Sequence, residues 1–317
     1  MGGKAMNWLS GRIRSKLVLA VVSVLGLLSL APPSQAVGPD TFSGLNGRIA
    51  FASDRSGHSQ IYSVLPDGRG LRQLTHASGD SVIADYSPDG RKITFDSDRT
   101  GQVQIYTMNA DGSQVRQLTH GSNFSGDPAY SPDGTRIAFN RCFSRAGCGI
   151  WVMDSNGRNQ IALTSAAAIN LEPTFSPDGS QIAFQSNRTK GVWAIYTMSA
   201  NGSHVRRITP LSLDAAHADY SPDGLRIAFN SNFSVPHSSI FTVRPDGTGL
   251  RQLTDPASAL NDFRPSYSPL GNLIVFNSTR NGFDIWVMNA DGTQLHNITP
   301  GSRGLDFAPD WGPRVVP

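Results

Sequence analysis

The sequence is short of charge and of the patterns that build long amphipathic helices. Only 16% of its 317 residues are charged and Glu172 is its one glutamate, whereas it holds 32 glycines and 20 prolines. Few charges with many turn-formers indicate short strands joined by turns. A hydrophobic content of 38% is enough for one large domain or two small ones.

Common catalytic motifs are also missing. There is no Gly-x-Ser-x-Gly nucleophile elbow and no His-Glu-x-x-His zinc motif. The seven histidines show no spacing typical of metal ligands. Nothing in the sequence therefore requires an enzyme.

The basic excess of the chain lies in its N-terminus. The formal net charge is +3, but the first 36 residues contain four basic residues and no acidic one. The remainder has 23 basic against 24 acidic residues, a net charge of −1. Nucleic-acid binding needs a basic patch that neutralises phosphates. We therefore expect no nucleic-acid partner.

The N-terminus has the three parts of a secretory signal. A basic stretch precedes the 14-residue apolar run Leu17–Leu30, which is too short to span a bilayer comfortably. Pro32, Pro33 and the small residues of Ser34–Ala36 follow, so we predict a signal peptide cleaved after Ala36, with an uncleaved anchor as the alternative. No cysteine follows the run and no Arg-Arg pair precedes it, which favours the general secretory route. We expect a secreted or periplasmic protein of the cell envelope, with no stable membrane span after cleavage.

Cysteine is limited to one close pair. Cys142 and Cys148 are separated by five residues. That spacing does not match a CxxC redox or zinc motif, and no histidine lies nearby. In an exported protein such a pair predicts a disulfide, here clamping the loop of a β-hairpin, with free thiols as the alternative.

A four-residue turn repeats along the chain at nearly constant spacing. Ser-Pro-Asp-Gly begins at Ser87, Ser131, Ser176 and Ser221, and a degenerate Ser-Pro-Leu-Gly begins at Ser268. The prolines of successive turns are 44, 45, 45 and 47 residues apart. This period is that of one four-stranded propeller blade, and Pro and Asp suit the turn itself. We expect these aspartates to shape turns and not to catalyse.

Strand signals recur in phase with the turn. An aromatic residue precedes it, and a strand containing Phe, an Ile–aromatic pair, an Asx-Gly turn and a short Leu-Thr or Ile-Thr strand follow. The repeated phenylalanines are Phe51, Phe95, Phe139, Phe184, Phe229 and Phe276. Six copies predict six blades.

The first copy lacks an inner strand, and the C-terminus supplies one. Pro309–Pro313 matches the inner-strand segments Pro128–Pro132 and Pro173–Pro177. We therefore predict an all-β, six-bladed β-propeller of four-stranded blades. A C-terminal strand beside Arg48–Phe51 should complete the N-terminal blade and close the ring. Trp311 should pack between the first and last blades.

The repeats resemble those of the TolB-like β-propeller family. The resemblance is strongest in Ile93–Thr119 and Ile285–Gly292 and extends over residues 46–313. It implies the fold and says much less about function. TolB has an α/β domain before its propeller, but only about ten residues separate Ala36 from the first repeat, so we expect that domain to be absent. Similar repeats form gating propellers on proteases, whose hydrolase domain is not found here.

The expected organisation follows from these boundaries. We predict a signal peptide (1–36), a short linker (37–45), the propeller (46–313) and a C-terminal tail (314–317). The protein is expected to be a monomer.

Variable polar residues mark the innermost strands. Two positions per strand share the face opposite the repeated aromatic residue and vary between copies, which fits a solvated channel. One set is Ile83, Asp127, Glu172, His217, Arg264 and Ala308, and the other is Asp85, Ala129, Thr174, Asp219, Ser266 and Asp310. The candidate ligand-binding residues are Asp85, Asp127, Glu172, His217, Asp219, Arg264 and Asp310.

These residue types allow three uses of the channel. It could be water-filled with no specific ligand, it could bind a cation or a cationic peptide end, or it could supply acid–base catalysis. A three-histidine metal site, known in some propeller lyases, is weakly supported by the scattered histidines. No other cofactor is expected.

The sequence favours binding over catalysis. We expect an exported, non-catalytic propeller that binds a protein, peptide or small ligand of the bacterial envelope at the channel mouth. The alternative is a small propeller enzyme, such as a lyase, lactonase or glycan hydrolase. Its candidate residues are Asp127, Glu172, His217, Asp219 and Arg264.

Overall fold

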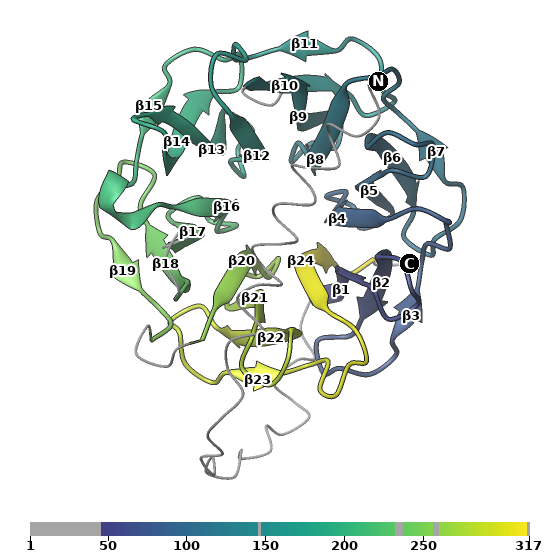
Figure 1. Cartoon of the computed structure of the whole chain (residues 1–317). Helices are drawn as coiled ribbons and strands as arrows, with labels where there is room; N and C mark the ends of the chain where they lie inside the picture. Colours follow the sequence, from purple (N-terminus) through teal and green to yellow (C-terminus); the bar gives the residue numbers. More distant parts are fainter. Residues whose placement is uncertain (1–45, 145–146, 232–236, 256–259, 316–317) are drawn as a thin grey trace. The chain divides into compact units, whose positions relative to one another are not determined.

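The computed structural model describes residues 46–144, 147–231, 237–255 and 260–315. In this part of the chain, six four-stranded sheets surround a central channel, as Figure 1 shows. Every strand pairing within a sheet is antiparallel. The predicted six-bladed propeller is confirmed. The predicted signal peptide and linker lie outside the described residues.

The strands follow the sequence repeat. From the channel outward, the first blade holds β24 (Asp306–Pro313), β1 (Asn46–Ser53), β2 (Gln60–Val64) and β3 (Arg72–Gln73). The second holds β4 (Ser81–Tyr86), β5 (Lys92–Ser97), β6 (Gln104–Asn109) and β7 (Arg116–Gln117), and the third β8 (Phe124–Tyr130), β9 (Arg136–Ser144), β10 (Gly147–Asp154) and β11 (Ile161–Ala162).

The remaining three blades have the same order. The fourth holds β12 (Asn170–Phe175), β13 (Gln181–Thr189), β14 (Val192–Ser199) and β15 (Arg206–Arg207). The fifth holds β16 (Ala216–Tyr220), β17 (Ile227–Ser231), β18 (Ser239–Val243) and β19 (Arg251–Gln252), and the sixth β20 (Asp262–Tyr267), β21 (Leu273–Ser278), β22 (Asp284–Asn289) and β23 (His296–Asn297). A short 3-10 helix, η2 (Leu211–Leu213), precedes the fifth blade.

Side chains within each Ser-Pro-Asp-Gly turn hold it in shape. The Ser87 hydroxyl donates to Asp89 Oδ1 (2.6 Å) and accepts the Lys92 N–H (2.9 Å), and Asp89 Oδ1 also accepts the Arg91 N–H (3.0 Å). The same contacts recur in the turns that begin at Ser131, Ser176 and Ser221. These aspartates therefore serve the turn, in line with their expected role.

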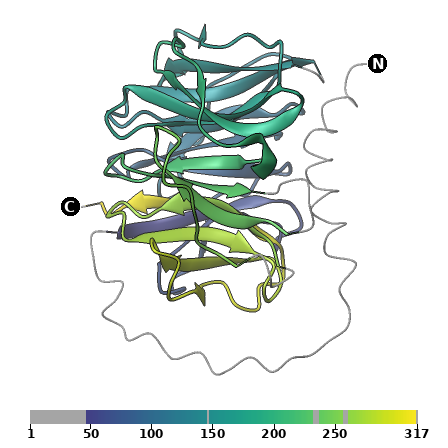
Figure 2. The ribbon, with the colours of Figure 1, turned by 90° about the vertical axis from the view of Figure 1, so that its left-hand side faces the viewer.

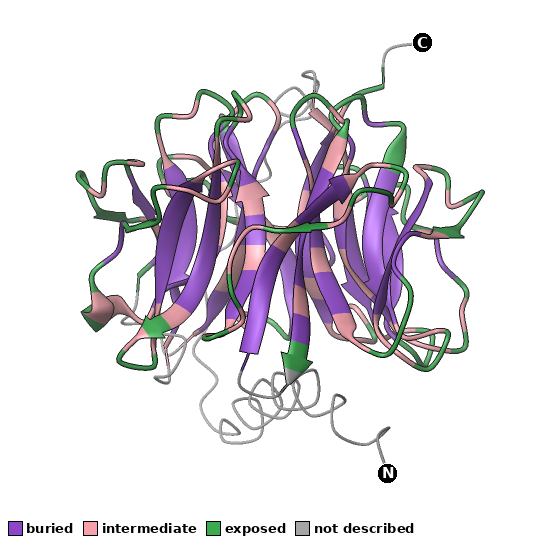
Figure 3. Ribbon diagram, turned by 90° about the horizontal axis from the view of Figure 1, so that it is seen from above, coloured by how far each residue is buried: buried purple, intermediate pink, exposed green. Residues whose placement is uncertain are grey.

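The core lies between neighbouring blades. All six repeated phenylalanines are fully buried, and Figure 3 shows the buried strands between exposed loops. Tyr130 of the third blade packs against a buried cluster that includes Ile105 and Leu118 of the second. Phe175 of the fourth blade belongs to a buried cluster that includes Ile150 of the third. Tyr86, Tyr220 and Tyr267 likewise pack in clusters that span two neighbouring blades. The aromatic residue before a turn thus helps to join its blade to the preceding one.

The C-terminal strand closes the ring. β24 pairs with β1, with Trp311 opposite Ile49 and Asp310 opposite Ala50, and Figure 2 shows the yellow β24 beside the purple β1. Trp311 is 4% exposed, and β24 contacts β20 and β21 of the last blade. Gly312 lies so close to the Tyr86 ring that a Cβ at this position would collide with it. The predicted closure by the chain's two ends is confirmed.

The predicted disulfide is present, but it lies within the sheet. Cys142 of β9 and Cys148 of β10 are bonded and occupy paired positions in the ladder. Both strands extend beyond the cysteines, so the bridge joins two strands near their ends and does not sit in a loop between them.

Among the residues that the structure describes, no helix is long and apolar enough to cross a bilayer.

Candidate functional site

The inner strands enclose a cavity of about 110 Å³ in the central channel. Three consecutive residues from each of the six inner strands line it, such as Asp127, Pro128 and Ala129 of β8. All seven sequence-selected site residues belong to this lining. Pockets that enclose drug-sized ligands measure roughly 300–1,000 Å³. The cavity has room for a side chain, a chain end or a few water molecules.

A β-bulge on every inner strand sets this geometry. The ladder between the first and second strand of each blade shifts register at this point. One residue per bulge has a φ of 50° to 55°, in the left-handed region: Ile83, Asp127, Glu172, His217, Arg264 and Ala308. None is glycine, although glycine would adopt this conformation with least strain. Side chains are thus kept at a strained position that faces the channel.

Glu172, His217 and Arg264 form one contact group in the wall. Glu172 Oε1 lies 2.5 Å from Arg264 Nη2 and 3.3 Å from His217 Nε2. The exposed fraction of the side chain is 12% for Glu172, 9% for His217 and 20% for Arg264. Burial would raise the pKa of Glu172, but the Arg264 charge, helped by His217, lowers it to about 2. Glu172 is therefore ionised throughout the physiological range.

Asn230 orients the other two members of the group. Its Oδ1 lies 2.6 Å from His217 Nδ1 and accepts the Arg264 main-chain N–H at 3.2 Å. Gln185 Oε1 accepts the His217 main-chain N–H at 2.9 Å. These amides hold the bulges of two neighbouring blades in register.

Asp127 lies next to a second buried carboxyl, Asp96. Burial and the charge of Glu172 raise the pKa of Asp127 to about 7. Burial and Asp127 raise the pKa of Asp96 well above its usual range. The Asn140 amide, with its nitrogen toward Asp127, donates to Asp127 Oδ2 (2.5 Å) and to the carbonyl of Gly126 (3.1 Å). This side of the channel can therefore hold protons near neutral pH.

Sequence reasoning missed Asp96, Gln185 and Asn230, which stand behind the channel wall. Each directly follows a repeated phenylalanine, and this position is polar in five of the six copies: Asp96, Asn140, Gln185, Asn230 and Asn277, with Ala52 as the exception. Asn277 Oδ1 accepts the main-chain N–H of Ala308 (3.3 Å), as Gln185 and Asn230 do for their bulges. The recurrence of a polar residue directly after the repeated phenylalanine is the sequence signal that could have indicated these supporting residues.

Asp85, Asp219 and Asp310 form a separate set that links blades. Their carboxylates accept the main-chain N–H of Tyr130 (2.8 Å), Tyr267 (2.7 Å) and Tyr86 (2.9 Å), each on the following blade. Burial is the main cause that raises the pKa of Asp219 to about 7, that of Asp310 to about 6 and that of Asp85 well above its usual range. These three residues thus have a structural role that their sequence pattern did not indicate.

The seven candidates therefore divide into two groups. Glu172, His217 and Arg264 are in contact, with Asp127 beside them, whereas the three blade-linking aspartates lie two residues further along their strands. In the part of the chain that the structure describes, no group of three His, Cys, Asp or Glu is placed to hold a metal ion.

These raised pKa values predict a protein that is most stable in mild acid. Between about pH 4, where unfolded carboxyls titrate, and pH 6–7, the folded chain retains protons on Asp127, Asp219 and Asp310 that the unfolded chain has released. Raising the pH through this window therefore lowers the free energy of unfolding. Glu172 acts oppositely, but only below about pH 4.5.

Thermal melts between pH 4.5 and 8.5 measure this dependence. The Tm should fall by about 5 °C or more from pH 5 to pH 8. Asp219→Asn, which keeps an acceptor for Tyr267, should flatten the slope. Asp111→Asn in an exposed turn should leave it unchanged. A Tm that rises over this range would exclude these proton-holding carboxyls.

The fold and the channel together define the class of protein. This is a six-bladed β-propeller with a closed ring and ionisable side chains in a narrow central channel. The chain belongs to the TolB β-propeller family, because the family model described as "TolB beta propeller domain" matches residues 29–141 and 119–315. No curated protein matches the chain.

Solved structures support the same fold. TolB from Acinetobacter baumannii is 24% identical with a TM-score of 0.76, over 87% of this chain and 68% of that one. A putative TolB from Agrobacterium tumefaciens is 21% identical with a TM-score of 0.66, over 86% and 100%. Oligogalacturonate lyase from Vibrio parahaemolyticus is 16% identical with a TM-score of 0.55, over 79% and 73%. At these identities the likeness concerns the fold.

Proposed function

We propose that this protein is an exported, non-catalytic propeller that binds a protein or peptide at the mouth of its central channel. The observation that carries the proposal is the convergence of Glu172, His217 and Arg264 in a cavity of about 110 Å³. A space of this size takes an inserted side chain or chain end, and the rest of a partner would lie on the propeller face. Repeated rigid blades offer a wide surface for such a partner.

Export and location are part of the proposal. The basic N-terminus, the apolar run Leu17–Leu30 and the small residues before Ala36 support secretion to the bacterial envelope or exterior. The Cys142–Cys148 disulfide supports an oxidising compartment. The partner would then be an envelope component.

A small propeller enzyme is the second candidate. It is favoured by the contact of a carboxylate, an imidazole and a guanidinium in one cavity, and by the likeness in fold to an oligogalacturonate lyase. Acidic oligosaccharides and lactones are the substrates to assay. Turnover that is lost in Glu172→Gln but kept in Asp246→Asn would establish this candidate in place of the first.

Affinity capture tests the binding proposal. Wild type, Glu172→Gln and Asp246→Asn are immobilised and exposed to an envelope extract. Asp246 lies in an exposed turn where two other blades have Asn156 and Asn201, so its change is a matched control. We expect at least one protein to be retained by wild type and Asp246→Asn and reduced about tenfold on Glu172→Gln. Equal retention on all three would place binding elsewhere.

A further inference from the structure

The disulfide lies at the entrance of the strand that carries Glu172. In five blades, the residue two positions before the left-handed bulge residue donates its main-chain N–H to a carbonyl of the preceding blade. The residue that provides this carbonyl, here called the anchor, lies at the start of the third strand of that blade or just before it. These anchor carbonyls belong to Ser59, Val103, Trp193, Ser238 and Phe283. At the entrance to the fourth blade the equivalent anchor is Cys148. Since the chain has two cysteines, this is the one anchor held by a disulfide.

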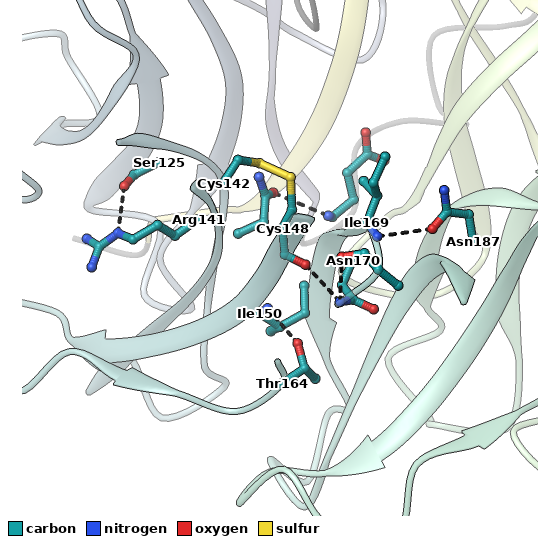
Figure 4. Close-up of a disulfide and its surroundings, with 12 residues drawn as sticks. Ser125, Arg141, Cys142, Cys148, Ile150, Thr164, Ile169, Asn170 and Asn187 are labelled. Atoms are coloured by element: carbon teal, nitrogen blue, oxygen red, sulfur yellow. Dashed lines mark hydrogen bonds between the residues drawn. A yellow bond between two sulfur atoms is a disulfide. The ribbon is translucent and has the colours of Figure 1, made fainter. Parts of the chain in front are cut away.

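Cys148 contacts the lead into β12 through both its main-chain N–H and its carbonyl. The Asn170 amide nitrogen donates to the Cys148 carbonyl (2.8 Å), and the Cys148 N–H donates to the Ala168 carbonyl (3.0 Å). A parallel β-bridge joins Cys148 to Ile169, and Figure 4 shows the disulfide beside Ile169 and Asn170. A Cβ on Gly147 would collide with the Ala166 carbonyl. The third blade and the lead into β12 are thus locked together at this point.

The path from the disulfide to the channel is short. Leu171 packs in one buried cluster with Cys142 and Cys148. Asn170 Oδ1 also accepts from Ser186 Oγ (2.8 Å) and Arg188 Nη2 (2.7 Å), which fixes Asn170 on its own blade. Glu172 directly follows Leu171 on β12 and sits at the bulge. Its backbone is therefore held from both blades immediately before it turns into the channel.

We propose that the Cys142–Cys148 disulfide is a positioning element of the channel, which holds the Glu172 carboxylate between Arg264 and His217 through Cys148 and Asn170. For its biological role the inference rests on the proposed function of the same channel. Without the bridge, the end of the β9–β10 hairpin loses its covalent support, and β12 loses a fixed anchor. Glu172 then no longer holds its 2.5 Å contact with Arg264.

The position of the Glu172 carboxylate can be followed through its ionisation, because Glu172 is the one glutamate of the chain. Labelling glutamate at the carboxyl carbon with ¹³C gives one protein signal, which reports the ionisation of Glu172 directly. In the wild type with the disulfide formed, this signal should remain that of a carboxylate at pH 4. In the folded Cys142→Ser/Cys148→Ser variant, the titration midpoint should rise by about one pH unit or more, because the buried carboxyl loses its cation.

Two further variants keep the test decisive. Ser81→Ala removes the Arg99 hydrogen bond at the start of β4, which corresponds to the Arg188 bond of Asn170. The bulge residue of β4 is Ile83, so this variant should leave the Glu172 titration unchanged. Asn170→Ser keeps the disulfide, mimics Ser81 and shortens the reach to Cys148, so it should raise the midpoint even if the double-cysteine variant does not fold. A midpoint equal to that of the wild type in folded Asn170→Ser or in the folded cysteine variant would overturn the proposal. No partner is used, so a failed partner search would bear on the proposed function alone.

Discussion

Deletion of residues 306–317 should abolish cooperative folding or lower the Tm by well over 10 °C. The deletion removes β24, the inner strand of the first blade, and leaves the edge of β1 unpaired. It also removes buried Trp311, and a buried Trp→Ala change alone costs about 3–5 kcal/mol. Circular dichroism melts and size-exclusion chromatography measure the loss of structure and any aggregation.

A shorter deletion provides the control for ring closure. Removing residues 314–317 takes away the segment after β24, in which Arg314 and Val315 are exposed. This variant should melt close to the wild type. Trp311→Ala should lie between the two, about 10 °C below the wild type. If the longer deletion melts like the shorter one, the two chain ends do not hold the ring together.

Replacement of Arg264 by Met should be the most damaging single change in the channel. Arg264 is the cation that keeps buried Glu172 ionised, and removal of one partner of a buried ion pair typically costs about 3–5 kcal/mol. The Tm should fall by about 10 °C. The pKa of Glu172 should rise toward or above its ordinary value because burial is then opposed mainly by His217.

A double-mutant cycle separates this pairing from a general packing effect. Glu172→Gln removes the charge that Arg264→Met leaves unpaired, so the double variant should recover part of the loss. A coupling free energy of at least about 1 kcal/mol is expected for groups in direct contact. Additive losses in denaturant melts would show that Arg264 stabilises the channel independently of Glu172.

The fold could be predicted from the sequence because its signals are local and repeated. Asx-Gly and Ser-Pro-Asp-Gly turns specify their own geometry, and six copies specify the number of blades. The match of Pro309–Pro313 to internal inner strands specified the closure. The cysteine spacing predicted the disulfide pairing but not its position within the sheet. That position depends on where β9 and β10 end, and Gly147 at the start of β10 is in close contact with Ala166.

The candidate site could be predicted only in outline. Assuming regular alternation, the sequence placed all seven residues on one face and treated them as one group. The β-bulges could not be predicted from the sequence. Their left-handed residues include Ile83 and Ala308, and none of the six is a glycine that would indicate a positive φ. The role of Asp85 depends on the main-chain N–H of Tyr130 in another blade, to which the sequence gives no local cue.

The affinity of the captured partner for the channel variants tests binding at the channel most directly. Titration calorimetry would compare wild type, Glu172→Gln and Asp246→Asn with the same purified partner. We predict a Kd at least about tenfold weaker for Glu172→Gln and unchanged for Asp246→Asn. An equal Kd for all three proteins would contradict partner binding through Glu172 in the central channel.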